Sequence, residues 1–161
     1  MADVALADAL KAVMRSFVRS VVVISARRGD ALFAITATAV AEVSLSPPSM
    51  LFCVNRMTRI FEAIEAGEDV ALNVLRADQA TISHVCGGAV PNSERFAGDD
   101  WECDGAGPPL LREALAVVVL RPANFVDHGS HRVVVGNVID VRASGVGSAL
   151  TYGEGVYLTG K

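Results

Sequence analysis

The sequence predicts a mostly β fold with short helices attached. β-branched and apolar runs recur along the 161 residues, and most of these runs follow one another directly instead of alternating with helical patterns. Apolar residues make up 52% of the chain, which is enough to bury a sizeable core. Consecutive strands favour an antiparallel barrel or sandwich over a doubly wound fold. No repeat or linker interrupts the pattern, so we expect a single domain over residues 1–161.

An amphipathic helix is expected at the start of the chain. Apolar residues recur at helical spacing from Val4 to Phe17, with acids near the beginning and basic residues near the end. The β-branched run from Val21 to Ile24 then predicts a strand over residues 18–26. Similar runs predict the other strands, over residues 31–38, 39–45, 50–55, 69–75, 115–121, 124–127, 132–141 and 156–158.

Two short helices are expected between the middle strands. Thr58 is predicted to cap the first of them and Asp78 the second, because hydroxyl and carboxylate side chains accept hydrogen bonds from the first turn of a helix. Residues 87–109 are rich in Gly, Pro, Asn and Asp and predict a long loop, and such loops in compact domains are often functional. Arg27 and Arg28 fall in a turn, where we expect solvated side chains.

Charge and composition exclude several classes of partner. The net charge is −4 and the pI is about 5.3, so no basic excess points to nucleic acid or to an anionic membrane surface. No apolar run reaches the ~20 residues of a membrane span, and no secretory signal is apparent. The three cysteines have no metal-site spacing, and His128 and His131 lack a third ligand, so no metal is expected. We expect a soluble, cytoplasmic protein with reduced thiols.

No motif for hydrolysis or for a phosphate-binding loop is present, and Gly-x-Gly-x-x-Gly does not follow the first strand. The remaining polar groups gather on two strands and at the start of a helix: Thr36, Thr38 and Ser44, then Asn55, Arg56, Thr58 and Arg59. A helix N-terminus with arginines can bind an anion. The residues alone are more typical of an ordinary capped helix with solvated arginines.

Three blocks of sequence carry a resemblance to a known family. They are residues 35–40 (ITATAV), 43–48 (VSLSPP) and 51–56 (LFCVNR), and shorter segments agree in order over about residues 12–157. The blocks resemble the signature of the flavin reductase-like family, which comprises the reductase components of two-component flavin monooxygenases. The resemblance implies a split β-barrel, a homodimer, FMN or FAD as flavin, NADH or NADPH as electron donor, and a separate monooxygenase partner.

The resemblance also implies roles for individual residues. Thr36, Thr38, Ala39 and Val40 would line the flavin ring and ribityl chain, and Ser44, Asn55, Arg56 and Thr58 would hold the ribityl and phosphate groups. Ser83, His84 and Arg95 would close over the flavin phosphate or the nucleotide. His131 would border the nicotinamide pocket, and we hypothesise that it orients the nicotinamide or moves a proton. Hydride transfer between two stacked rings needs positioning and not a protein nucleophile.

The sequence departs from the family at a few positions. Glu42 stands where a small residue is common, and we expect it to point outward because a carboxylate would oppose a reduced, anionic flavin. Two alternatives to a reductase stay open. One is an electron carrier that keeps its FMN and receives electrons from a protein donor, and the other is a binding domain that has lost catalysis.

Overall fold

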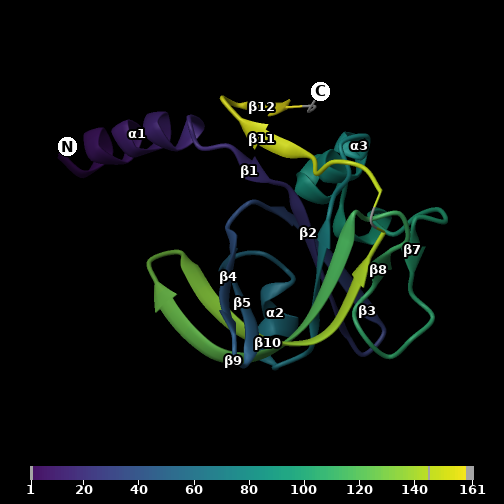
Figure 1. Cartoon of the computed structure of the whole chain (residues 1–161). Coiled ribbons are helices and arrows are strands. Elements are labelled where there is room, and N and C mark those ends of the chain that lie inside the picture. Colours follow the sequence, from purple (N-terminus) through teal and green to yellow (C-terminus); the bar gives the residue numbers. More distant parts are fainter. Residues whose placement is uncertain (1, 145, 159–161) are drawn as a thin grey trace.

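Seven antiparallel strands form one curled sheet, which confirms the mostly β fold (Figure 1). The computed structural model describes residues 2–144 and 146–158. In space the strands run in the order β3-β2-β6-β9-β10-β5-β4. Their bounds are β2 (Val22–Arg28), β3 (Ala31–Ala37), β4 (Val40–Leu45), β5 (Pro48–Asn55), β6 (Val70–Val74), β9 (Ala116–His128) and β10 (His131–Ala143).

The sheet is a split barrel because its two edges approach each other without pairing. The edge strands β3 and β4 are separated by only Thr38 and Ala39, so the sheet has to curl until its edges lie close together. The amide of Cys53 in β5 donates to the carbonyl of Ala39, which fixes the link against the sheet. No ladder joins β3 to β4 within the described part of the chain. The split therefore opens beside the Thr36–Ala39 segment.

Small sheets and short helices surround this barrel. The strands β1 (Arg19–Ser20), β11 (Thr151–Gly153) and β12 (Val156–Leu158) form one small sheet, and β7 (Trp101–Glu102) pairs with β8 (Leu110–Leu111). The helices are α1 (Ala2–Arg15), α2 (Phe61–Glu65) and α3 (Ala80–His84), and α3 continues into a π-helical turn, η1 (Val85–Ala89). A 3-10 turn, η2 (Asn92–Glu94), lies in the long loop. The described residues contain no helix long and apolar enough to cross a membrane.

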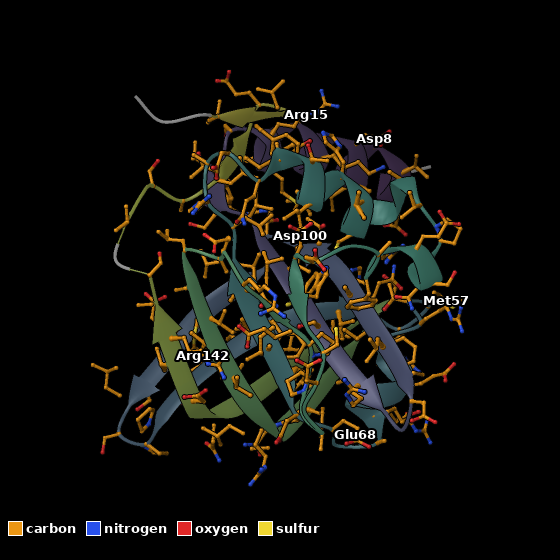
Figure 2. All side chains as sticks on the ribbon, turned by 90° about the vertical axis from the view of Figure 1, so that its right-hand side faces the viewer. Asp8, Arg15, Met57, Glu68, Asp100 and Arg142 are labelled. Atoms are coloured by element: carbon orange, nitrogen blue, oxygen red, sulfur yellow. The ribbon has the colours of Figure 1, made fainter. Side chains whose placement is uncertain are left out.

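The helix α1 lies apart from the barrel (Figure 1). Figure 2 shows Asp8 and Arg15 of this helix at the opposite end of the molecule from Glu68. Its position agrees with the amphipathic helix predicted from the sequence, but its apolar side chains remain exposed to solvent.

Two apolar clusters share the segment of residues 21–24, which leads into β2. Side chains alternate across a strand, so Val22 and Ile24 pack into the barrel interior with Phe52, whereas Val21 and Val23 face α3 and the long loop. All five side chains are at most 3% exposed. A β-branched run buried on both faces explains why this segment gave the clearest strand signal.

The structure corrects both predicted helix caps. The Thr58 hydroxyl donates back to the Asn55 carbonyl at 2.6 Å, and α2 begins three residues later without a side-chain cap. Asp78 pairs with Arg76 at 2.9 Å, which leaves α3 without a side-chain cap too. In each case the polar side chain bonds to a nearer partner instead of to the first turn of the helix.

The long loop is fastened to the sheet by buried polar groups. Asn73 is fully buried on β6 and accepts the Leu111 amide at 2.8 Å, while its amide nitrogen donates to Ser25 at 2.9 Å. The Ser25 hydroxyl in turn donates to the Pro109 carbonyl. Arg27 donates to the carbonyls of two loop residues, so the prediction that this side chain is solvated is wrong.

Candidate functional site

A cavity of about 510 Å³ opens at the split of the barrel. Its walls come from the β3–β4 link, the end of β5, the approach to α2, the turn η1 and the long loop. Seven of the residues proposed from the sequence line it: Thr36, Thr38, Ala39, Asn55, Thr58, Arg95 and His131. The volume lies within the range of small-molecule sites, which span roughly 300–1,000 Å³.

The first cavity carries positive charge. Arg59 and Arg95 line it, and within the described residues its wall contains no carboxylate and neither arginine forms a salt bridge. Arg95 is half-buried and is held by neutral groups, since its Nη1 donates to the Ala34 carbonyl at 2.6 Å. Two uncompensated guanidinium groups on one wall favour an anionic ligand such as a phosphate.

A second cavity of about 630 Å³ adjoins the first, and the two share Thr36, Thr38 and Gly87. Ser83 and His84 line this second cavity, where the latter packs edge to face on Tyr157 with ring centroids 5.0 Å apart. Its lining is aromatic and apolar, and it carries no arginine or lysine within the described residues. The two cavities therefore differ in character, one suited to an anion and the other to a flat ring.

The shared wall is rigid. The Thr36 hydroxyl donates to the Ser83 carbonyl at 2.6 Å, which joins β3 to α3. The Ser83 hydroxyl lies 2.8 Å from the Tyr157 hydroxyl and is 1% exposed, so Ser83 builds the wall and does not reach into the cavity. Strand-borne hydroxyls held in this way can position a ligand without reorganising.

His131 lies at the start of β10, opposite Asn55 of β5 in the strand register. Its Nδ1 is 2.8 Å from the Ser130 hydroxyl, and the ring is exposed at the mouth of the first cavity. The first cavity, and not the second, therefore contains this histidine.

Three of the proposed residues lie away from both cavities. Val40 lines a neighbouring groove that shares Thr38 and Ala39 with the first cavity. Ser44 of β4 pairs with Ser49 of β5. Ser49 is six residues from Asn55 along β5, so about 20 Å of strand separates Ser44 from the end of β5 that lines the first cavity. Arg56 is exposed, and its charge contributes, after Arg132, to lowering the pKa of Asp127 at the end of β9. Glu42 is exposed, as the sequence predicted.

Cys86 adds a neutral wall to the first cavity. The side chain is 2% exposed, and burial raises the pKa of its thiol to about 11, against a smaller opposing effect of the Arg95 charge. The thiol is therefore protonated near neutral pH and is a poor nucleophile. Within the described residues no group of three metal-ligating side chains is arranged to hold a metal ion.

Comparison with known proteins decides the family. Residues 14–161 match the family described as flavin reductase like domain. The chain belongs to this family. It is 34% identical to the FMN reductase (NADH) RutF 2 of Rhizobium rhizogenes, over 72% of this chain and 67% of the relative. It is also 34% identical to the reductase component of the FADH(2)-dependent resorcinol hydroxylase of Rhizobium sp., over 89% of this chain and 82% of the relative.

A solved structure agrees with this membership. BorF, the flavin reductase component of a bacterial two-component tryptophan halogenase, superposes with a TM-score of 0.85 at 28% identity, over 94% of this chain and 96% of that chain. The split barrel expected for this flavin reductase-like protein is therefore confirmed by both its own strand order and its structural neighbour.

Some residues of the site had little signal in the sequence. Arg59 stood in the predicted anion site, but the family resemblance assigned it no role, and the structure brings it into the first cavity. The first cavity is lined by Gly87 of η1 and by Asn92 of the long loop. The second cavity is lined by Gly87 and by Tyr157 of β12. A single asparagine in a polar loop has no pattern that marks it, because its role depends on which strand edge the loop crosses.

Proposed function

We propose that this flavin reductase-like protein catalyses hydride transfer from NADH to FMN or FAD and releases the reduced flavin to a separate monooxygenase. The observation that carries the proposal is the pair of adjoining cavities, which meet at Thr36, Thr38 and Gly87. The names of the relatives support the choice of ligands, since one is an NADH-dependent FMN reductase and another serves an FADH(2)-dependent hydroxylase.

The two cavities suggest how the ligands are arranged. Arg59 and Arg95 would hold the flavin phosphate in the first cavity, because they are the only arginine or lysine side chains on that wall within the described residues. The aromatic wall of the second cavity would receive the nicotinamide ring. When bound, the reduced nicotinamide supplies the hydride that the flavin accepts.

The protein contributes position and electrostatics to this reaction. Thr36 and Thr38 stand where the cavities meet and offer hydroxyl oxygens on a rigid strand end. His131 lies in the first cavity, a placement that favours proton movement at the flavin over orientation of the nicotinamide.

We further infer that the protein acts as a homodimer in the cytoplasm. Five apolar side chains of α1 and the segment after it, Val4, Leu6, Leu10, Val13 and Phe17, are each more than half exposed. An apolar surface of this kind is typical of an interface. Light scattering on the Leu10→Asp variant tests this, and a wild-type monomer would contradict it. The free thiols are compatible with a reducing compartment.

The experiment that tests the reductase proposal is an anaerobic mixture of protein, NADH and a molar excess of FMN, followed at the absorbance of oxidised flavin. Bleaching of many flavins per protein is expected if flavin is a substrate. Bleaching of only one bound equivalent would indicate a carrier with a resident flavin, and absence of bleaching with NADH and NADPH would refute the enzyme.

A further inference from the structure

The side chain of Asn92 takes the place of a neighbouring strand at the outer edge of β3. Its Oδ1 accepts the Ala34 amide at 3.3 Å, and its Nδ2 donates to the Leu32 carbonyl at 2.7 Å. A side-chain amide offers a donor and an acceptor, as a peptide group does, so it can satisfy both positions of a strand edge. The loop is thereby attached to the strand whose end, at Thr36, forms the wall between the cavities.

Arg95 directly follows the turn η2, and uncharged backbone carbonyls bind its guanidinium group on both sides. Its Nη1 donates to the Ala34 carbonyl at 2.6 Å, and its Nε and Nη2 each donate to the Val90 carbonyl at 3.3 Å. Its own carbonyl accepts the Trp101 indole at 3.1 Å. A guanidinium has five N–H groups, so these bonds leave two for a ligand in the first cavity.

We propose that Asn92 is a positioning residue that sets the Arg95 guanidinium toward the phosphate end of a flavin in the first cavity. Ala34 joins the two side chains, since its amide bonds to Asn92 and its carbonyl to Arg95. Loss of the Asn92 bonds frees the turn η2 from the strand edge, and the guanidinium loses its fixed direction. The inference rests on the proposed function, because it assumes that a flavin phosphate is the anion.

The test compares FMN with riboflavin, which has the same ring and no phosphate. Dissociation constants are measured by quenching of flavin fluorescence for the wild type, for Asn92→Ala, Asn92→Asp, Arg95→Ala and Asn124→Ala, and for the double variant that combines Asn92→Ala with Arg95→Ala. Asn124 is an exposed asparagine of β9 whose side chain makes no hydrogen bond within the described residues, and it serves as the matched control. Thermal unfolding shows which variants fold. If Asn92→Ala does not fold, Asn92→Ser replaces it.

The wild type is expected to prefer FMN. Asn92→Ala should weaken FMN binding about tenfold and leave riboflavin binding within about twofold, as expected for a misdirected charge-assisted hydrogen bond. Asn92→Asp should weaken FMN at least as much, because it puts a carboxylate beside Arg95. The effect of Asn92→Ala should largely vanish in the Arg95→Ala background.

The outcomes separate this inference from the proposed function. Equal loss for FMN and riboflavin in folded Asn92→Ala would mean that Asn92 only supports the wall, and unchanged FMN binding would mean that it does not position Arg95. Either result overturns the inference and leaves the reductase intact. A wild type that binds neither flavin overturns the proposed function itself.

Discussion

Replacing Asn73 by alanine should loosen the long loop and destabilise the protein. The side chain is fully buried, accepts the Leu111 amide at 2.8 Å and donates to Ser25 at 2.9 Å and to the Val23 carbonyl at 3.0 Å. A buried amide left without a partner costs about 1–3 kcal/mol, and each further hydrogen bond lost costs about 1 kcal/mol. The sum is about 3–5 kcal/mol, which corresponds to a drop in Tm of roughly 10 °C for a chain of this size.

Urea unfolding followed by far-UV circular dichroism measures this loss, with Asn124→Ala as the control. Limited proteolysis reports the local effect, because residues 97–110 should be cleaved faster once their anchor to β6 and β2 is gone. A change in unfolding free energy below about 1 kcal/mol, with unchanged cleavage, would refute the view that the buried Ser25–Asn73 pair fastens the loop.

Three other predictions follow from single contacts. Gly136→Ala should lower the unfolding free energy in urea by about 1–3 kcal/mol, since its new Cβ would lie 2.9 Å from the Leu120 Cβ; equal stability would contradict this. His131→Ala should slow NADH oxidation in steady-state assays, and an unchanged rate and KM would exclude a catalytic role. Cys86, with a thiol pKa of about 11, is about one part in a thousand ionised at pH 8. Mass spectrometry should therefore find iodoacetamide on Cys53 before Cys86, and the reverse order would contradict the burial argument.

Local patterns predicted most of the fold because strands with β-branched runs need little information from elsewhere. The last strand, over residues 156–158, and the strand at residues 31–37 agree with prediction almost to the residue. The sequence predicted one strand before Pro122 and a second strand after it, whereas the structure has a single strand, β9, that contains this proline. A bulge at Ala123 shifts the register there and lets the strand pass a proline, which lacks the amide that a ladder requires.

Most of the site was predictable because a resemblance to a known family supplied it, whereas Arg59 came from the anion site predicted from the residues alone. Thr36 and Thr38 belong to a specific sequence block, and they lie where the cavities meet. Ser44 belongs to the next block, yet the direction of β4 carries it to the far end of the strand. The part played by Asn92 depends on a contact between residues about sixty positions apart, which no local pattern encodes.

The central claim is that a flavin and a nicotinamide meet at Thr36 and Thr38. A crystal structure of the protein with FMN and NAD⁺ tests this most directly. We expect the flavin phosphate beside Arg59 and Arg95 and the two rings facing each other at the threonines. A flavin ring bound elsewhere, for example in the groove beside Val40, would contradict it.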